Sequence, residues 1–232
     1  MMLDAHLVAA YPPFALDVRL RVAAGEVVAL AGPSGAGKTT ALRLLAGLAA
    51  PAGGYVLLDG APLYARPPGR RSVGMVLRDP LLFSHLSVLD NVAFGPRCHG
   101  AGTAEARRAA TAWLHDLGLG ALARARPGEL SREQAQRVAL ARSLAAGPRV
   151  LLLDEPLAGV ADPARPELRD LLRRHLSCFA GPCVLVTHDP AEAAALADRL
   201  VVVENGAIVQ DGTPEEVARH PRTRYAARLT TS

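Results

Sequence analysis

The sequence is 232 residues long, half of its residues are hydrophobic, and its formal net charge is +4 at pH 7. This length suits one domain with a sizeable core, or one domain that carries an inserted subdomain. No run of 18 or more apolar residues occurs and no basic residue precedes Arg19, so we expect neither a membrane span nor a secretory signal, and place the protein in the cytoplasm. The arginines are scattered with few aromatic residues among them, which gives little support to nucleic-acid binding.

Short apolar runs alternate with helical patterns, which predicts an α/β fold with a largely parallel sheet. The first predicted buried strand is Val27–Ala31, followed by a glycine-rich loop and a helix over Lys38–Ala46. Two more buried strands are predicted at Val150–Leu153 and Cys183–Thr187, with a helix over Asp162–Leu176 between them.

The C-terminal part predicts a hairpin and a short helix. Val201–Glu204 and Ala207–Gln210 are joined by Asn205-Gly206, a dipeptide that suits a type I′ turn. Thr213 is the predicted N-cap of the helix that follows, and Pro214 is its first residue.

The middle of the chain, from about 81 to 144, is rich in alanine and arginine with helical spacing. We interpret it as an α-helical subdomain inserted into a core formed by 1–80 and 145–232. The whole of 1–232 is then predicted to be a single domain.

A phosphate loop is predicted between the first strand and its helix, because residues 32–39 match the pattern G-x-x-x-x-G-K-[ST]. Backbone N–H groups of such a loop point at a phosphate. Lys38, the sole lysine among 26 basic residues, is expected to neutralise the β- and γ-phosphates, and Thr39 to ligate Mg²⁺. The predicted nucleotide-binding residues are Gly32, Pro33, Ser34, Gly35, Ala36, Gly37, Lys38, Thr39 and Thr40.

Two later strands end in residues suited to phosphate chemistry. Asp154 and Glu155 follow an apolar strand, and because adjacent strand residues face opposite sides, we assign them different roles. Asp154 is the predicted metal ligand and Glu155 the predicted general base that orients the attacking water. His188 follows another buried strand and is a candidate for contact with the γ-phosphate. Solvated acids and a surface histidine are the alternatives, and the phosphate loop favours the catalytic interpretation.

With these elements in this order, the chain resembles the ABC transporter ATPase family over essentially its full length. The segment Leu130–Arg142 resembles the family's signature segment and the helix that it opens. The resemblance implies a sandwich of two cassettes, in which Ser131 of one subunit caps the γ-phosphate held by Lys38 of the other. Tyr11 or Phe14 would stack on adenine, with ordinary packing as the alternative.

The same resemblance implies an ATPase that uses ATP and Mg²⁺ and lies on the cytoplasmic face of the membrane. Its implied partners are a transmembrane permease subunit, a second cassette, identical or different, and indirectly a solute-binding protein. The stretch 82–96 resembles the family's surface that binds the membrane subunit. Asn91–Arg97 is similar to importer cassettes, molybdate-type ones most of all.

Three departures from the family pattern predict normal ATP binding and reduced turnover. Arg78 stands where the family has Gln, and a guanidinium has no acceptor for a metal ion, although it could bind the γ-phosphate. The family's Leu-Ser-Gly-Gly-Gln reads Leu-Ser-Arg-Glu-Gln, with the altered segment formed by Ser131, Arg132, Glu133 and Gln134. After Pro156, the family's Ser-Ala-Leu-Asp is replaced by Ala-Gly-Val-Ala, which ends at Ala161, with Asp162 one position further on.

The carboxylate of Glu133 would face the partner's γ-phosphate. At an effective dielectric near 20, two like charges about 4 Å apart repel by roughly 4 kcal/mol. Arg132 could relieve this repulsion, or the Glu133 side chain could turn away. Ser131 and Gln134 have the spacing of a capping box, so the helix should still begin there.

Two other functions remain as alternatives to an active transport ATPase. One is a non-hydrolysing or regulatory cassette with degenerate composite sites. The other is a cassette of DNA repair or translation, which the single short cassette without a long coiled-coil insertion disfavours.

Overall fold

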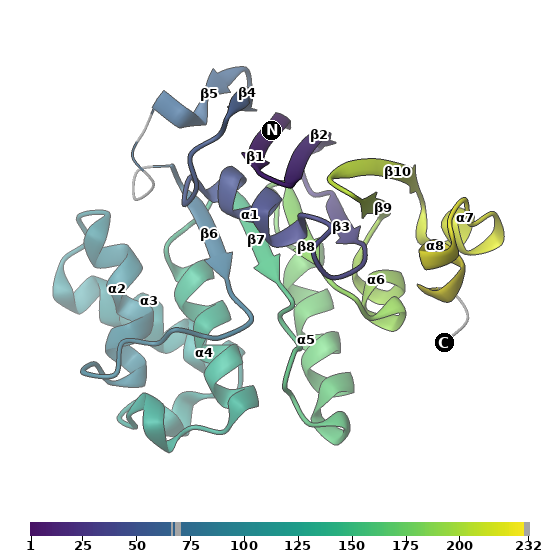
Figure 1. Cartoon of the computed structure of the whole chain (residues 1–232). Helices are drawn as coiled ribbons and strands as arrows, with labels where there is room; N and C mark the ends of the chain where they lie inside the picture. Colours follow the sequence, from purple (N-terminus) through teal and green to yellow (C-terminus); the bar gives the residue numbers. More distant parts are fainter. Residues whose placement is uncertain (66, 68–70, 230–232) are drawn as a thin grey trace. The chain divides into compact units, whose positions relative to one another are not determined.

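The computed structural model of the chain describes residues 1–65, 67 and 71–229 (Figure 1). By their contacts these described residues form two compact units, the first from those within 1–73, 149–155 and 173–229, the second from 74–148 and 156–172. The segment 156–172 therefore groups with the helical middle of the chain. The predicted single domain with a subdomain at 81–144 stays a prediction.

The first unit contains a largely parallel sheet, with strands in the spatial order β10 (Ala207–Gly212), β9 (Arg199–Glu204), β3 (Val27–Ala31), β8 (Cys183–Val186) and β7 (Val150–Asp154). β3 pairs in parallel with β8 and β9, β7 pairs in parallel with β8, and β10 is antiparallel to β9. β3, β7 and β8 are buried along their whole length, as parallel strands covered on both faces are. The predicted α/β fold with a largely parallel sheet is confirmed.

A second, antiparallel sheet of this unit has the order β2 (Phe14–Val22), β1 (Leu3–Tyr11), β4 (Gly53–Leu58) and β5 (Ala61–Pro62), followed by the short helix η1 (Leu63–Ala65). Our sequence interpretation had no strands here. The pattern that could have found them is the alternation of β1, in which Leu3, Ala5 and Leu7 are buried and the residues between them are partly exposed. Two of its inward-facing residues, Ala5 and Ala9, are alanines, so the alternation is faint.

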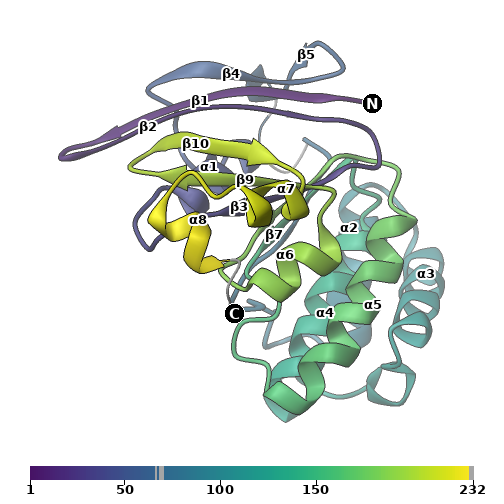
Figure 2. The same cartoon turned by 90° about the vertical axis from the view of Figure 1, so that its right-hand side faces the viewer.

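Helix α1 (Lys38–Ala46) of this unit begins at Lys38 and contacts β1, β7 and β8. Three short helices follow β8: α6 (Pro190–Leu196), α7 (Pro214–Arg219) and α8 (Arg224–Leu229). Figure 2 shows α7 and α8 side by side next to the β9–β10 pair. They bury an apolar cluster with β3 and β9, formed by Ala29, Ala31, Ala193, Leu200, Val202, Val217, Ala226 and Leu229.

The predicted hairpin and late helix are confirmed. Asn205 and Gly206 have φ values of +50° and +79°, as a type I′ turn requires. The Thr213 side chain accepts a hydrogen bond from the Glu216 amide, and Pro214 is the first residue of α7. The pairing of β9 with β10 contains a register shift between Ile208 and Gln210.

The second unit is mainly helical, with α2 (Val88–Cys98), α3 (Thr103–Asp116), α4 (Arg132–Ala145) and the short helices η3 (Gly120–Leu122), η4 (Pro127–Glu129) and η5 (Asp162–Ala164). α2 packs against α3 and α4. The close packing needs a small residue, because a Cβ on Gly95 would lie 2.7 Å from the Ala146 Cβ. Strand β6 (Val73–Val76) leads into this unit, and helix α5 (Arg165–Ser177) leads out of it.

The helix predicted over Asp162–Leu176 needs a correction at its start. Asp162–Ala164 is a 3₁₀ turn and α5 begins only at Arg165. Pro163 and Pro166 explain the difference, because proline lacks the N–H that an α-helix interior needs and is tolerated only in the first turn.

None of the described helices is both long and apolar enough to cross a membrane.

Candidate functional site

The phosphate loop of the first unit joins the end of β3 to the first residue of α1. Gly35 and Gly37 have φ values of +81° and +103°, which glycine adopts without steric cost. A Cβ on Gly37 would also lie 2.8 Å from both Phe14 Cζ and Leu16 Cδ1. Glycine is therefore required at position 37 both by the backbone and by its neighbours on β2.

The start of α1 is suited to an anion. Among the described residues no side chain caps this end, and its first turn carries no acidic residue. Its amide groups and the positive end of the helix dipole are then available to a phosphate. The Lys38 ammonium donates to the carbonyl oxygens of Gly32 (2.7 Å) and Pro33 (2.9 Å). The Lys38 ammonium is thus bound by the backbone of the same loop.

Asp154, at the end of β7, lies next to the loop. The Thr39 hydroxyl donates to Asp154 Oδ1 at 3.4 Å, and Asp154 is buried. Burial raises the pKa of Asp154 and the nearby Glu155 raises it further, whereas Thr39, Arg43 and Lys38 oppose the shift. Burial also lowers the pKa of Lys38, against the attraction of Glu155 and Asp154.

These groups fit a Mg²⁺ ion. Mg²⁺ is held in such sites by one or two protein oxygens, together with phosphate oxygens and waters. Thr39 and Asp154 supply one hydroxyl and one carboxylate side by side, and the carboxylate is buried beside a second acid. A bound cation would offset that unfavourable concentration of negative charge.

Glu155 leaves the strand in a left-handed conformation. Its φ is +47°, an uncommon value for a residue with a side chain, and its amide donates to the Val186 carbonyl at 2.9 Å. The assumption that strand alternation separates Asp154 from Glu155 is wrong, because β7 ends at Asp154 and the chain turns there. Both carboxylates raise the pKa of Lys38, against the effect of its burial.

His188 lies next to Glu155 in the structure. His188 follows β8, and its Nδ1 lies 3.5 Å from Glu155 Oε2. The His188 side chain is 64% exposed and that of Glu155 is 19% exposed. The predicted base and the predicted phosphate contact are thus neighbours, with the histidine on the open side.

Two residues that the sequence did not point to also hold the phosphate loop. The backbone of Gly32 hydrogen-bonds to the Tyr225 hydroxyl of α8. The Gly206 amide donates to the Ala36 carbonyl at 3.2 Å. The Asn-Gly pair was interpreted only as a hairpin turn, and no sequence pattern connects Tyr225 to a loop almost 200 residues earlier.

Gly206 sits between the loop and β2. Its carbonyl accepts a hydrogen bond from the Asp17 amide at 2.8 Å, and a Cβ on it would lie 1.8 Å from the Ala15 carbonyl oxygen. A side chain at this position would separate the hairpin turn from β2 and disturb the support of Ala36.

The two candidates for adenine stacking are placed differently. The Phe14 ring lies against Gly37, as the close approach to its Cβ position shows. Tyr11 pairs with Phe14 across the turn between β1 and β2 and is half exposed. Adenine stacking by either ring stays a prediction.

In the second unit, the predicted capping box at the start of α4 is confirmed. Ser131 Oγ accepts from the Gln134 amide at 3.2 Å, and Gln134 Oε1 accepts from the Ser131 amide at 2.9 Å. The Glu133 carboxylate turns along the helix to Arg137, whose guanidinium also binds Glu167 Oε1 at 2.9 Å. Glu133 is therefore neutralised by Arg137 and not by Arg132.

The residues at the other two departures also lie in this unit. Arg78 is exposed in the loop after β6, and its carbonyl accepts a hydrogen bond from Arg132 Nη2 at 3.1 Å. Ala161 precedes η5, and Asp162 is 3.7 Å from Arg165. The roles predicted for Ser131, Gln134 and Arg78 toward a second subunit's nucleotide stay predictions.

An aromatic groove, formed by His85, Leu86, Phe94, Arg97 and Cys98, lies on the second unit and has a volume of about 330 Å³. The Phe94 ring packs on Phe83 with 4.6 Å between centroids, and the Arg142 guanidinium lies 5.2 Å from the Phe83 centroid. Phe94 remains 41% exposed.

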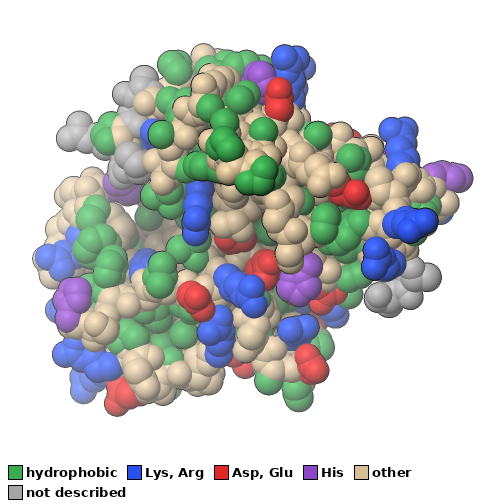
Figure 3. Space-filling model, in the orientation of Figure 1, with side chains coloured by type: hydrophobic (Ala, Val, Ile, Leu, Met, Phe, Trp, Pro, Cys, Tyr) green, Lys and Arg blue, Asp and Glu red, His purple; other side chains and the backbone are tan. Residues whose placement is uncertain are grey.

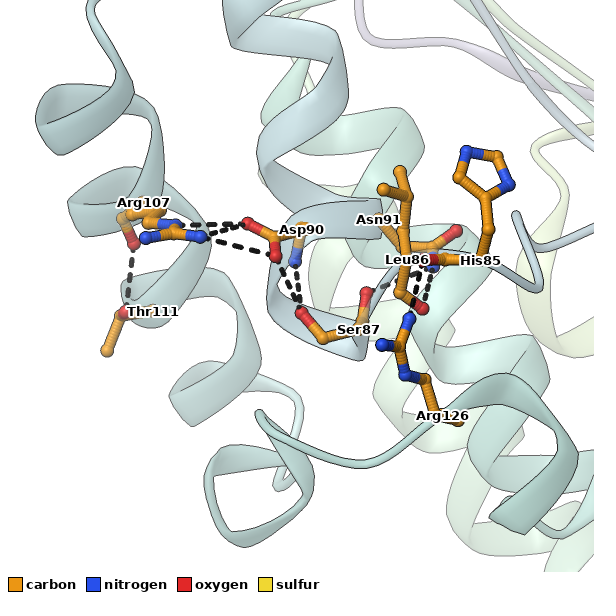
Figure 4. A network of polar contacts seen from close by, with 8 residues as sticks. All are labelled: His85, Leu86, Ser87, Asp90, Asn91, Arg107, Thr111 and Arg126. Atoms are coloured by element: carbon orange, nitrogen blue, oxygen red, sulfur yellow. Dashed lines mark hydrogen bonds and ion pairs between the residues drawn. The ribbon is translucent and has the colours of Figure 1, made fainter.

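Figure 4 shows how the loop beside this groove is fixed. The buried Asn91 side chain donates to the carbonyls of Phe83 (3.1 Å) and Ser87 (3.0 Å), and Arg126 donates to the His85 carbonyl. Asp90 binds Ser87 and also Arg107 of α3. The loop beside the groove is thus held mainly by side chains that bond its backbone, while Phe94 stays partly exposed.

Charged side chains of both signs lie on the face shown in Figure 3. Acidic and basic side chains of the described residues are mixed near the middle of this face, and several basic side chains gather at its right-hand edge.

The family model for the ABC transporter matches residues 16–158. The chain belongs to the ABC transporter family. The match to the ABC transporter model includes the phosphate loop, the signature segment, Asp154 and Glu155, and it confirms the resemblance seen in the sequence. His188 and Tyr225 lie beyond it.

The chain is also similar in sequence to individual ABC proteins. The chain is 46% identical over 224 residues to the molybdenum import ATP-binding protein ModC of Mycobacterium tuberculosis, covering 92% of the chain and 61% of that protein. It is 43% identical to the Fe(3+) ions import ATP-binding protein FbpC of Rhizobium etli, covering 91% of the chain and 60% of that protein. The chain thus spans about 60% of the length of these relatives.

A solved structure of the ABC family has the same fold. CbiO1 of Clostridium perfringens, part of the ABC transporter complex CbiONQ, superimposes with a TM-score of 0.83 at 31% sequence identity. The superposition covers 94% of this chain and 90% of CbiO1.

Proposed function

We propose that this chain is the ATP-binding and ATP-hydrolysing subunit of an ABC importer. The observation that carries the proposal is the phosphate loop with Thr39 3.4 Å from Asp154 and with Glu155 directly after it. These groups could bind a triphosphate, hold a metal ion and activate water within one small region. The ABC transporter match to residues 16–158 supports the same activity.

Each residue has a distinct part in the proposed hydrolysis. The amides of the loop and Lys38 would bind the β- and γ-phosphates, and Thr39 and Asp154 would hold Mg²⁺, which would neutralise charge on the phosphates. Glu155 orients the attacking water and accepts its proton. His188, 3.5 Å from Glu155, donates to the γ-phosphate and keeps the Glu155 side chain in place.

The proposed partners are a permease subunit in the membrane and a second cassette. The aromatic groove supports the first, because an apolar hollow of about 330 Å³ with a half-exposed phenylalanine suits a short helix of the permease. The protein would then lie at the cytoplasmic face of the membrane, and a solute-binding protein would act through the permease.

We propose molybdate or another oxyanion as the imported solute. Support comes from the 46% identity to a protein named for molybdenum import, while a relative named for iron import is 43% identical. Uptake of labelled molybdate, sulfate and ferric ion into cells with and without the gene distinguishes these solutes. Loss of ferric uptake alone would contradict the oxyanion proposal.

We further propose that turnover is reduced by Arg78 and Glu133. Arg78 brings no acceptor oxygen to the metal, and Glu133 with Arg137 fills the place of a bare glycine backbone. Steady-state hydrolysis by Arg78→Gln plus Glu133→Gly should exceed that of the natural protein. No increase would show that these residues do not limit the rate.

A non-hydrolysing cassette is the alternative, since the departures fall in the segments expected to face a second subunit. Hydrolysis of Mg-ATP by the purified protein decides between the two, with Glu155→Gln as the control. Rates that are equal in both proteins contradict the proposal. Sedimentation with Mg-ATP adds a second measurement, because a working cassette should dimerise and a degenerate one should remain monomeric.

A further inference from the structure

The loop after β6 is attached to α4 by side chains of that helix. Gln136 Nε2 donates to the Leu77 carbonyl at 3.0 Å. Arg142 donates to the carbonyls of Pro80 (2.9 Å) and Leu81 (2.8 Å). Gln136 is buried and Arg142 is partly buried, so these carbonyls take the place of water as their acceptors.

Arg132, the first residue of α4, completes this set. Its Nη2 donates to the Arg78 carbonyl at 3.1 Å and to Asp79 Oδ1 at 2.9 Å. Four carbonyls of residues 77–81 thus accept hydrogen bonds from three side chains of one helix.

Arg132 also reaches a second loop of the same unit, the turn 156–159. Its Nε donates to the Ala158 carbonyl in a long hydrogen bond of 3.4 Å. The side chain lies directly on Gly159, because a Cβ there would be 2.6 Å from Arg132 Nε and 3.1 Å from Arg132 Cζ. Gly159 also has a φ of +74°, which favours glycine.

The residue types at these two positions are complementary. The family pattern has glycine at the position of Arg132 and alanine at the position of Gly159, so that this chain has a side chain in the first place and none in the second. An alanine at 159 would occupy the space of the Arg132 guanidinium. The side chain of Arg132 and the absence of one at Gly159 therefore fit one another, whereas the bond from Arg132 to position 78 is made to the backbone carbonyl.

We propose that Arg132 is a positioning residue that fixes the loops 77–81 and 156–159 to the N-terminus of α4, with Gly159 as its matched partner. The departures at Arg132 and Gly159 are then one connected change and not two separate losses. The consequence for turnover rests on the proposed function, since these loops carry or precede positions 78 and 161. The positional claim itself stands on contacts within the second unit.

A double-mutant cycle of Arg132→Gly and Gly159→Ala tests the pairing by urea unfolding, without any requirement for hydrolysis. Gly159→Ala brings the strain of its positive φ in either background, and the collision with the guanidinium only when Arg132 is present. We expect Gly159→Ala to lower the folding equilibrium constant at least fivefold more in the natural background than in Arg132→Gly. Equal effects in both backgrounds would overturn the pairing.

Hydrogen exchange tests the positioning. In Arg132→Gly, amides within 77–81 and 156–161 should exchange about 3- to 10-fold faster, the effect of losing about one hydrogen bond at each loop. Arg108→Gly on α3 is the control, because the Arg108 side chain is exposed and makes no hydrogen bond among the described residues. Faster exchange throughout the unit, or in neither loop, would show that Arg132 has no specific positioning role. Arg132→Lys should restore slow exchange only partly, because an ammonium lacks the forked donors of a guanidinium.

Discussion

His188 Nδ1 lies 3.5 Å from Glu155 Oε2, on the open side of a carboxylate that is itself mostly buried. Glu155 is held by a left-handed backbone conformation just after β7, and His188 by its place just after β8. Because β7 and β8 are parallel neighbours, their carboxyl ends deliver these two side chains to the same spot. The pair is therefore a consequence of the sheet and not of local sequence.

His188→Ala should lower the rate of ATP hydrolysis about 10- to 100-fold while the Kd for Mg-ATP changes less than threefold. The reason is that the imidazole positions the Glu155 carboxylate and the reacting phosphate, whereas affinity comes from the phosphate loop. Steady-state kinetics and titration with a fluorescent nucleotide measure the two quantities. His220→Ala, a change of another histidine in the first unit, is the control. A large loss of affinity with an unchanged kcat would place His188 in binding instead.

Lys38→Ala should abolish the thermal stabilisation that Mg-ATP gives. At 100 times its Kd, a ligand stabilises by about 2.7 kcal/mol, which corresponds to roughly 5–10 °C in Tm for a chain of this size. Lys38→Arg should lose most of the effect too, because a planar guanidinium cannot take the place of the ammonium between the carbonyls of Gly32 and Pro33. Differential scanning fluorimetry with and without nucleotide gives the result. A normal shift in Lys38→Ala would remove Lys38 from the site.

The sequence predicted the central elements of this fold because their patterns are local. The buried strands Val27–Ala31 and Val150–Leu153, the glycine loop and the Asn-Gly turn all carry their information in consecutive residues. The antiparallel sheet was missed, since its inward-facing positions include alanines whose hydrophobic contrast with their neighbours is small.

The candidate site could be predicted in part for the same reason. Glycine, lysine and carboxylates at fixed spacing point to phosphate chemistry, but the support of the loop by Tyr225 and Gly206 is a tertiary contact with no spacing of its own. The direction of the Glu133 side chain was open in the sequence, which allowed relief by Arg132 or a side chain that turns away. Only the structure shows that the Glu133 carboxylate pairs with Arg137 and that the Arg132 side chain binds the loop 77–81 instead.

Asp154→Asn should make the nucleotide-free protein more stable at neutral pH. Burial and the nearby Glu155 raise the pKa of Asp154, so the folded state binds its proton more tightly than the unfolded state does. Stability then falls as the pH rises from the ordinary aspartate pKa of about 4 toward the raised value, and this loss is absent in the variant. Urea unfolding of both proteins between pH 4 and 8 should show a gap in favour of Asp154→Asn that grows with pH.

The same substitution should remove the effect of Mg²⁺ on nucleotide affinity, because an amide is a weaker ligand for the ion than a carboxylate. Titration of ATP with and without Mg²⁺ measures it. A variant that is less stable than the natural protein at pH 7, or that keeps its Mg²⁺ dependence, would contradict the place of Asp154 in the site.

Phe94→Ser should weaken association with the membrane partner without changing the fold. Phe94 is 41% exposed in the aromatic groove, so its removal leaves Asn91 and the backbone contacts of the loop in place. Co-purification with the permease subunit from detergent extracts should fall at least tenfold. Leu48→Ser, a change of an exposed apolar residue in the first unit, is the control. Equal recovery of both variants would place the membrane contact elsewhere.

Tyr225→Phe should lower the affinity for Mg-ATP about 2- to 10-fold, although Tyr225 is far from the phosphate loop in sequence. The substitution removes only the hydroxyl that is bonded to the backbone of Gly32 and keeps the ring against the apolar cluster of α8. Global stability should therefore change little, while the first glycine of the loop loses a fixed neighbour. Tyr55→Phe is the matched control, because its hydroxyl bonds Asp4 at 3.3 Å on the antiparallel sheet. If both variants bind Mg-ATP equally well, α8 stabilises the unit without positioning the loop. If only Tyr225→Phe binds more weakly, α8 is part of the nucleotide site.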